Sequence, residues 1–353
     1  MNILFHSNQL SERGTEVAMF DYALGNLKVL GGRSFIAAPK NRVFDKSVLD
    51  KFKSNFTVCL YNSLLELQDF IDVSQINLIY KIVHGGTKDE LLHDKIPHFI
   101  HCVFSTEAKY GAFYCPISEC VNKRFGTKYP VLPHIVKTFE EVEINKSIFR
   151  LKLRIPENAV VFGSYGGSKS FNIPFVKKSV VQIAKRETGI HFMFMNHEKF
   201  CDLPNVHFLP KTVDLIVKAH FIDACTAMLH ARSEGETFGL AVAEFSVRNK
   251  PVITYKPKDG KCFALLSRVL RKLGLDIFYS YYYDKAHLEY CHKSITYRNK
   301  KNLLYILQHF ENYYISDENY DCYSERFSEK NVMEIFCNII NNIVETKNEI
   351  QRL

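Results

Sequence analysis

Residues 226–254 read TAMLHARSEGETFGLAVAEFSVRNKPVIT. A short apolar run at 226–229 leads into a polar loop, and a run of small and apolar residues with helical character follows. The segment after Pro251 is apolar again and indicates a further strand. The order strand, loop, helix, strand is typical of a parallel sheet. Ligands of such sheets bind outside the carboxyl ends of the strands, so this loop is a candidate binding site.

The predicted helix start has the chemistry of a phosphate site, because its unpaired N–H groups and positive dipole end favour an anion. Glu244 lies about five residues into the helix, about 7 Å along its axis. That distance suits a carboxylate that accepts both ribose hydroxyls of a nucleotide whose phosphates sit at the helix start. Glu236 precedes the helix and would face the sugar side of the phosphates. The alternative interpretation is an amphipathic helix with a glycine-containing entry turn. The residues expected around the phosphates are Thr237, Phe238, Gly239 and Leu240.

The spacing of Glu236 and Glu244, with Phe238-Gly239 between them and the KPVI run after them, resembles the donor-binding signature of GT-B glycosyltransferases. It is most similar to that of retaining enzymes of glycosyltransferase family 4. The resemblance covers most of the chain, although its specific motifs lie mainly in residues 160–254. It implies an α/β fold of two Rossmann-like, doubly wound parallel-sheet domains that face each other across a cleft. It also implies a hexosyl- or pentosyltransferase that uses a UDP- or GDP-linked sugar. The RGTE run at 13–16 resembles a smaller subgroup, some of whose members are encoded by large DNA viruses.

The length of 353 residues and the alternation of apolar runs with helical patterns predict two such domains. We expect an acceptor-side domain over 1–138 and a donor-binding domain over 139–325. The amphipathic segment 326–353 is expected to be a terminal helix that packs back on the first domain, as in GT-B enzymes; a helix covering its own domain is the alternative. Boundaries in the second half are predicted as a helix over 212–221 and a strand over 278–283.

A glycine-rich loop at residues 163–169 follows the first predicted strand of the second domain. In the family, Gly-Arg opens this loop and a lysine follows five residues after the arginine, and both neutralise the donor diphosphate. The resemblance assigns that role to Lys169, but Ser164 occupies the arginine position. Arg232 or Arg13 would then supply the missing charge. Alternatively, the backbone approaches the phosphates directly at two residues without side chains, Gly166 and Gly167.

The first domain offers several further candidates at the ends of predicted strands. Gly14 lies in the loop that faces the donor phosphates in GT-B enzymes, and Arg13 beside it would bind phosphate or acceptor. The resemblance assigns His101 to the donor sugar, whereas a lone histidine at a strand end is often structural. If the enzyme inverts instead of retaining, Glu16 or His84 would serve as the base on the acceptor side.

We expect no metal and no cofactor, because the sequence contains no Asp-x-Asp pair and no convincing metal-ligand spacing. The ten cysteines include no Cys-x-x-Cys pair and are expected to be reduced. The net charge of +8 comes from dispersed basic residues, so no nucleic-acid partner is predicted. With no apolar run of membrane-spanning length and no signal-peptide pattern, a cytoplasmic protein is expected.

The sequence therefore predicts transfer of a sugar from a nucleoside-diphosphate sugar to a glycan, a glycoprotein or another hydroxyl acceptor. A sugar-nucleotide epimerase or hydrolase of the same fold is the first alternative. A non-catalytic nucleotide-sugar-binding protein is the second, because Ser164 departs from the family pattern.

Overall fold

The computed structural model describes residues 1–352 except 12–13, 43, 112, 140–141, 213, 258–282 and 314–320, with side chains up to residue 343. The chain forms two compact units. Unit 1 comprises Met1–Lys137 and Arg326–Leu353, and unit 2 comprises Thr138–Glu325. The expected strand at 278–283 and the candidate Arg13 fall largely or wholly outside the described residues.

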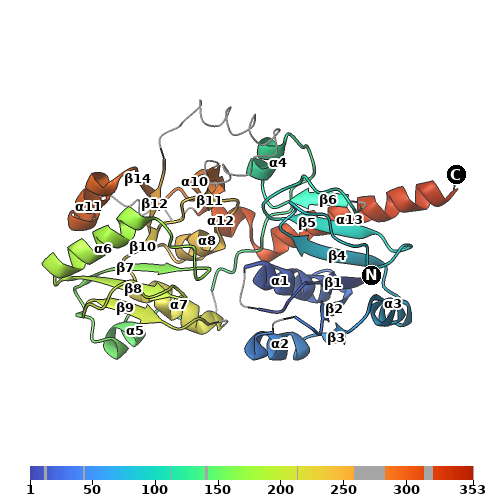
Figure 1. Ribbon diagram of the computed structural model, residues 1–353, viewed down its shortest axis with the longest axis horizontal. Helices are drawn as coiled ribbons and strands as arrows, with labels where there is room; N and C mark the ends of the chain where they lie inside the picture. The colour runs from blue at the N-terminus through green and yellow to red at the C-terminus, as the bar shows by residue number, and fades with distance from the viewer. Residues whose placement is uncertain are drawn as a thin grey trace. The chain divides into compact units, whose positions relative to one another are not determined.

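Unit 1 contains a six-stranded parallel sheet in the order β3-β2-β1-β4-β5-β6 (Figure 1). Its strands are β1 (Asn2–His6), β2 (Arg33–Pro39), β3 (Thr57–Tyr61), β4 (Leu78–Val83), β5 (His98–Cys102) and β6 (Phe113–Pro116). Its helices are α1 (Gly14–Lys28), α2 (Lys46–Lys53), α3 (Leu64–Val73), α4 (Glu119–Phe125) and α13 (Glu329–Arg352). The strand order reverses at β1, so this is a doubly wound sheet whose ligand edge lies at the carboxyl ends of the strands.

The sheet of unit 1 is buried on both faces, as expected for a parallel sheet with helices on each side. One face packs Leu4, Phe35 and Ile79 against Leu67 and Ile71 of α3. On the other face α1 contacts α13, so the last helix of the chain packs within unit 1. A ring of aromatic side chains fills that interface: Tyr22, Tyr80, Phe99, His101 and Phe336.

Unit 2 repeats this architecture with a parallel sheet in the order β14-β12-β10-β7-β8-β9. Its strands are β7 (Val160–Tyr165), β8 (Ile190–Met195), β9 (Val206–Leu209), β10 (Ala227–His230), β12 (Val252–Tyr255) and β14 (Ser294–Tyr297). A separate two-stranded pair consists of β11 (Gly235–Glu236) and β13 (Asp284–Lys285). Its helices are α5 (Ser147–Lys152), α6 (Pro174–Arg186), α7 (Leu215–Ala224), α8 (Leu240–Val247), α10 (Ala286–Tyr290), α11 (Lys300–Gln308), the 3-10 turn η2 (Phe310–Asn312) and α12 (Cys322–Arg326).

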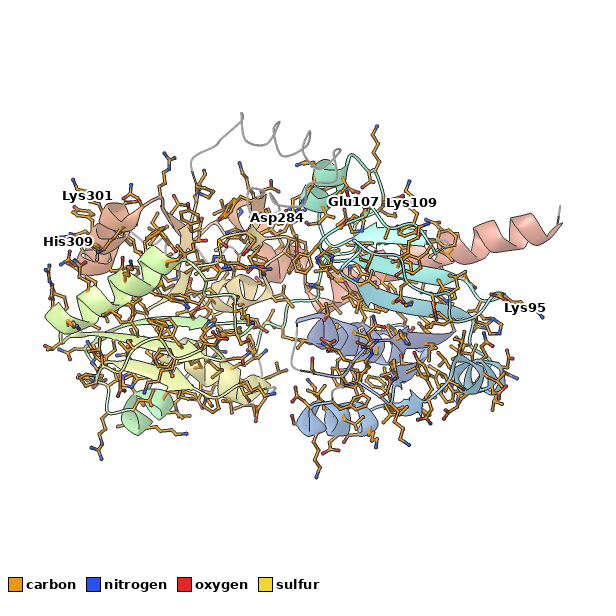
Figure 2. The ribbon with its side chains drawn as sticks, in the orientation of Figure 1. Lys95, Glu107, Lys109, Asp284, Lys301 and His309 are labelled. Carbon is orange, nitrogen blue, oxygen red and sulfur yellow. The ribbon has the colours of Figure 1, made fainter. Side chains whose placement is uncertain are left out.

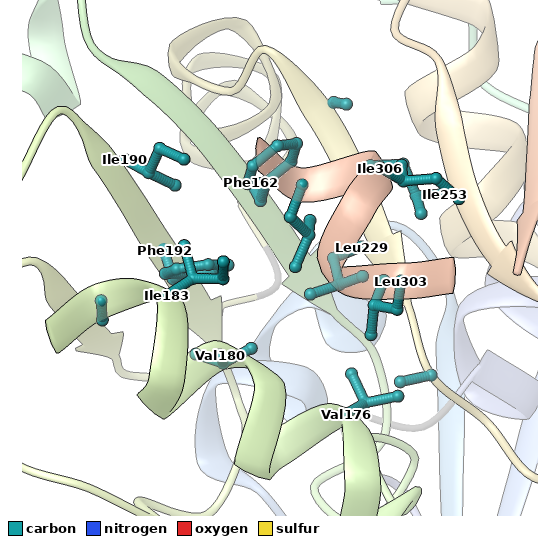
Figure 3. Close-up of a cluster of buried hydrophobic side chains, with 14 of the residues drawn as sticks. Phe162, Val176, Val180, Ile183, Ile190, Phe192, Leu229, Ile253, Leu303 and Ile306 are labelled. Atoms are coloured by element: carbon teal, nitrogen blue, oxygen red, sulfur yellow. The ribbon is translucent and has the colours of Figure 1, made fainter. Parts of the chain in front are cut away.

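One face of the unit 2 sheet is covered by α6 and α11, which also contact each other (Figure 3). Val176, Val180 and Ile183 repeat at helical spacing along α6, and they pack with Phe162 and Phe192 of the sheet. On the other face Tyr165 makes ring contacts with Phe221 of α7 and Phe245 of α8. Helix α8 follows β10 after the loop 231–239, so its start is reached from the carboxyl end of that strand.

Most predicted elements are present with small shifts in their ends. The helix predicted over 212–221 is observed at Leu215–Ala224, because Asp214 caps it by accepting from the N–H groups of Ile216 and Val217. The helix expected to begin near Phe238 begins at Leu240. The edge strand β14 was not predicted, since its SITY sequence is short and carries no flanking turn signal.

Candidate functional site

The candidate site is assembled around the loop between β10 and α8. Two glycines in this loop have positive φ angles, 70° at Gly235 and 88° at Gly239. A Cβ atom on Gly235 would lie 2.1 Å from the carbonyl oxygen of Asp284, so the β11–β13 pairing requires glycine at this position. The residue Asp284 is labelled in Figure 2. Gly239 is the N-cap residue of α8, and because a glycine has no side chain it cannot cap the helix with one. The start of α8 therefore has no side-chain cap from its N-cap residue, and it stays the candidate anion site.

Both oxygens of the Glu236 carboxylate have nitrogen partners. Arg232 NH1 lies 2.9 Å from Oε2, and His230 Nε2 lies 3.2 Å from Oε1. Burial alone would raise the pKa of Glu236, but the Arg232 guanidinium and His230 lower this pKa to about 2. The side chain is therefore an ionised acceptor of hydrogen bonds at neutral pH.

Arg232 is held by two carboxylates. Its Nε lies 3.8 Å from Glu234 Oε2, in addition to the contact of NH1 with Glu236. The attraction of Glu236 is the largest influence on the Arg232 pKa, which is raised above its ordinary value. The charge of Arg232 is thus compensated within the loop, which does not favour the expected role as a substitute phosphate ligand.

A buried chain of hydrogen bonds continues from His230 into the core of unit 2. His230 Nδ1 lies 2.8 Å from the Thr254 hydroxyl, which lies 3.1 Å from His287 Nε2. Burial, and then the neighbouring His230, lower the pKa of His287 to about 3, so His287 is neutral. Since an ionised Glu236 only accepts, His230 must carry a hydrogen on Nε2.

Glu244 lies in α8 and is 5% exposed. The Tyr165 hydroxyl donates a hydrogen bond to Glu244 Oε2. Lys218 Nζ lies 3.7 Å from Oε1 and 5.7 Å from the centre of the Tyr165 ring. Tyr165 is the last residue of β7, directly before the glycine-rich loop, so this contact ties Glu244 to that loop.

The other residues predicted around the helix start are largely enclosed. Thr237 and Phe238 are buried, and the Phe238 ring contacts Tyr290 and Tyr323. The Phe238 carbonyl accepts a hydrogen bond from the Tyr323 hydroxyl. Leu240, the first residue of α8, is partly exposed. The side chains of Thr237 and Phe238 are therefore enclosed within unit 2.

The glycine-rich loop is joined to the Glu236 loop by Asn172. The Asn172 side chain accepts from Ser233 N and donates to Glu234, at 2.8 and 3.1 Å. Within the glycine-rich loop Gly167 and Lys169 are exposed, and a Cβ atom on Gly167 would meet no heavy atom within 4 Å.

The Gly166 carbonyl oxygen accepts a hydrogen bond from the side-chain amide of Asn196 at 2.8 Å. Ser164 is buried, with its hydroxyl 3.2 Å from His197 Nε2. The residue at the position of the family arginine therefore points to a neighbour in the core and supplies no charge.

His101 in unit 1 is fully buried. Its Nδ1 lies 2.6 Å from the Tyr80 hydroxyl, and its Nε2 lies 2.8 Å from the Leu132 carbonyl oxygen. Burial lowers the pKa of His101 to about 3, so it is neutral. Both ring nitrogens are occupied within the core, and this arrangement argues against the expected contact of His101 with the donor sugar. Its ring neighbours are Tyr22, Tyr80, Phe99 and His134, and the sequence pattern around His101 does not reveal the contacts with Tyr22 and His134.

The other first-domain candidates lie at the carboxyl edge of the unit 1 sheet. Glu16, in the first turn of α1, is buried and accepts from Thr15 Oγ1 at 2.7 Å and from Ser7 Oγ at 3.2 Å. Gly14 opens α1 and is exposed, with no heavy atom within 4 Å of a built Cβ. His84 is exposed after β4, and partial burial together with Arg124 lowers its pKa.

Several residues of the site were not predicted as ligands or supports, among them Tyr165, Thr254 and His287. Tyr165 lies within the predicted glycine-rich segment 163–169, although the structure makes it the last residue of β7, and Thr254 lies in β12 after the signature, so both had a positional signal. His287 gave none, because it is distant in sequence and reaches Thr254 only through the tertiary fold. Among the described residues, no group of three or more His, Cys, Asp or Glu side chains is arranged to hold a metal ion. The nine cysteines in the described part of the chain are free thiols. No helix within the described ranges is long and apolar enough to cross a membrane.

The sequence matches no family model and no curated protein. The structure is similar to HepE from Anabaena, solved in complex with UDP and glucose, with a TM-score of 0.67 and 13% identity over 98% of this chain and 99% of that chain. It is also similar to a glycosyltransferase from Rickettsia africae, with a TM-score of 0.60 and 12% identity over 97% of this chain and 98% of that chain. A putative UDP-N-acetylglucosamine 2-epimerase from Listeria monocytogenes gives a TM-score of 0.57 and 10% identity over 98% and 97%. The chain thus has the two-sheet α/β fold of GT-B glycosyltransferases.

Proposed function

We propose that the protein is a glycosyltransferase that moves a sugar from a nucleoside-diphosphate sugar to a hydroxyl acceptor. The observation that carries this proposal is the placement of two carboxylates on either side of the α8 start. Glu236 is fixed ahead of the helix by Arg232 and His230, and Glu244 is fixed within it by Tyr165. A nucleotide sugar presents a sugar, an anionic diphosphate and a ribose in the same order.

In this proposal unit 2 binds the donor. Glu244 accepts the ribose hydroxyls, and the α8 start binds the diphosphate with its backbone N–H groups. Lys169, which is exposed in the glycine-rich loop, adds a positive charge, and Gly167 leaves room for close approach of the phosphates. Glu236 accepts hydroxyl hydrogens of the sugar. The structure of HepE with UDP and glucose supports a UDP-linked donor as the first candidate.

The reaction that we propose proceeds with retention and without a metal ion. The bond between the anomeric carbon and the diphosphate breaks while the acceptor oxygen bonds to the same face of that carbon. The departing phosphate takes the proton of the acceptor hydroxyl. Lys169 and the helix start stabilise the negative charge that develops on the diphosphate, so the leaving group needs little acid assistance.

Unit 1 is proposed to supply the acceptor side, with Gly14, Glu16 and His84 as the candidate residues and Arg13 as an additional one. A glycan or a glycoprotein is the proposed acceptor class. An inverting reaction would instead require a base, for which the exposed His84 is better suited than the buried, hydrogen-bonded Glu16.

The test begins with the melting temperature of the protein in the presence of UDP, GDP and their common sugar conjugates, since a ligand of the native state raises it. The conjugate that stabilises most is then incubated with glycan acceptors. Release of nucleoside diphosphate that requires the acceptor, with a new glycosidic bond whose anomeric configuration is read by NMR, supports the proposal. An inverted anomeric configuration refutes retention, and hydrolysis without an acceptor refutes transfer.

A sugar-nucleotide epimerase is the second candidate, because a putative UDP-N-acetylglucosamine 2-epimerase covers 98% of this chain at a TM-score of 0.57. The discriminating measurement is incubation with UDP-N-acetylglucosamine alone. Appearance of a second sugar nucleotide in the absence of any acceptor supports the epimerase and contradicts the transferase. Tight nucleotide binding with no turnover of any conjugate would support a non-catalytic binding protein.

A further inference from the structure

The Glu236 carboxylate is held at both oxygens by donors from different parts of unit 2. Arg232 reaches Oε2 from the loop after β10, and His230 reaches Oε1 from the end of β10 itself. We propose that Arg232 and His230 are positioning residues that keep Glu236 ionised and oriented, so that it binds sugar hydroxyls and takes no part in proton transfer. This inference rests on the proposed function and assigns Arg232 to the sugar side of the site instead of the phosphates.

The Arg232 side chain is itself fixed in orientation. Its Nε faces Glu234 Oε2 at 3.8 Å, while Asn172 donates to the same Glu234 oxygen at 3.1 Å. Asn172 also accepts from Ser233 N and its own backbone N–H donates to the Ala231 carbonyl. The loop that carries Arg232 is therefore anchored on both sides of this residue, at Ala231 and at Ser233, and its guanidinium contacts Glu236 from this fixed position. Such an anchored donor fixes the carboxylate more tightly than an exposed side chain does.

The His230 side is fixed by the buried chain through Thr254 and His287. The His230 ring bridges the ionised Glu236 and this chain, with Nε2 3.2 Å from Glu236 Oε1, Nδ1 2.8 Å from the Thr254 hydroxyl, and that hydroxyl 3.1 Å from His287 Nε2. His230 is further anchored through its carbonyl oxygen, which accepts from the Tyr297 hydroxyl at 2.9 Å. Protonation of Glu236 would remove one of the acceptor sites that face Arg232 and His230, so this carboxylate is a poor proton acceptor.

The charged and titratable residues near Glu236 lie in several elements of unit 2, including β10, β13 and α10. Burial raises the pKa of Glu236, but the charge of Arg232 and the hydrogen bond from His230 lower it further than burial raises it. Without Arg232 the burial of the carboxyl would remain while its main counter-charge is lost, so its pKa would rise. The groups are Arg232, His230, His287, Asp284, Tyr283 and Tyr323.

Within the described part of the chain each oxygen of the Glu236 carboxylate faces one nitrogen donor, whereas a carboxylate offers about four acceptor sites. The remaining sites are available for hydroxyl groups of the sugar. The acceptor proton must then leave with the diphosphate, which keeps the proton balance of the proposed transfer without Glu236.

The first test reads the ionisation of Glu236 in the unliganded protein and needs no turnover. Protein with ¹³C-labelled glutamate carboxyl groups is titrated by NMR, and Glu236→Gln identifies the signal of Glu236. We expect this signal to show an ionised carboxylate down to about pH 4 in the wild type, and to titrate above the ordinary glutamate pKa of about 4.3 in Arg232→Gln. Arg232→Lys, which keeps the charge, should titrate between the two. An unchanged titration in Arg232→Gln overturns the proposal.

The second test uses transfer. Arg232→Gln and His230→Ala should lower kcat about tenfold or more, since each removes a hydrogen bond to a charged group, and leave UDP affinity within about threefold. Arg232→Gln should also gain an acid limb in its pH profile at the pKa found by NMR. His230→Gln, which retains a donor for Oε1, should recover part of the kcat that His230→Ala loses. Loss of UDP affinity in step with kcat overturns the assignment to the sugar side. A wild type that turns over no nucleotide sugar refutes the proposed function, and the NMR titration still decides the state of Glu236.

Discussion

Tyr165 and Glu244 are joined by a buried hydrogen bond, although they lie 79 residues apart along the chain. Tyr165 ends β7 directly before the glycine-rich loop, and Glu244 lies in α8, whose start is the candidate diphosphate site. The proposed ribose ligand is thus connected to both segments that would hold the phosphates. Lys218 of α7 completes the arrangement on the other carboxylate oxygen.

Glu244→Gln is expected to weaken the binding of UDP or GDP about tenfold or more, with the fold retained. A carboxylate makes charge-assisted hydrogen bonds to ribose hydroxyls that contribute about 1.5–3 kcal/mol each, and an amide makes weaker ones. Calorimetry with the bare nucleoside diphosphate measures the change. Glu157→Gln, at an exposed glutamate of the same unit, is the matched control. An unchanged affinity in folded Glu244→Gln would refute the ribose assignment.

Tyr165→Phe is expected to lower nucleotide affinity by a few-fold and to lower the free energy of unfolding by about 1–3 kcal/mol. The substitution keeps the ring contacts with Phe221 and Phe245 but leaves one oxygen of a buried carboxylate without its phenolic donor. Urea unfolding and calorimetry give the two quantities. A gain in nucleotide affinity would mean that Tyr165 competes with the ribose for Glu244 instead of orienting it.

Transfer activity is expected to persist in excess EDTA. Lys169 and the α8 start supply positive charge for the diphosphate, and the described residues contain no cluster of metal-ligating side chains. The measurement is the initial rate after extensive dialysis against EDTA, with and without added Mg²⁺ or Mn²⁺. Complete loss of the rate, restored by either ion, would contradict the proposed site.

Acidification is expected to destabilise unit 1. Burial lowers the pKa of His6 to about 3, of His98 to about 4 and of His101 to about 3. In the unfolded chain these groups bind protons near their ordinary pKa of about 6.5, so the unfolded state binds more protons than the folded state below that pH. The stability from these neutral histidines is complete above about pH 6.5 and is lost as the pH falls toward 4.

The urea midpoint should therefore be lower at pH 5 than at pH 7. His101→Phe should reduce this difference, whereas substitution of the exposed His309 by Gln should leave it unchanged. A midpoint that stays constant or rises on acidification would contradict neutral, buried histidines in the native state.

The sequence alone predicted the part of the site that is contiguous along the chain. The strand before His230, the turn through Gly235 and Gly239 and the helix carrying Glu244 all follow from local apolar periodicity and from glycine's access to positive φ. For the same reason the alternation of apolar runs predicted two parallel α/β sheets, because each strand must be buried on both faces by the helices that connect it. The identity of the donor-site glutamates rests on the resemblance, and their roles stay predictions.

The tertiary structure decided which polar groups are engaged with one another. Arg232 is paired with Glu236 and Glu234, and the Ser164 hydroxyl lies against His197. His101, at the end of a strand, became a core residue because Tyr80 and the Leu132 carbonyl occupy both of its nitrogens. Residues adjacent in sequence share a backbone geometry, and short-range patterns report that geometry well. Burial and hydrogen-bond partners depend on segments that meet only after folding, and these determine whether a charged or titratable side chain remains available for a ligand.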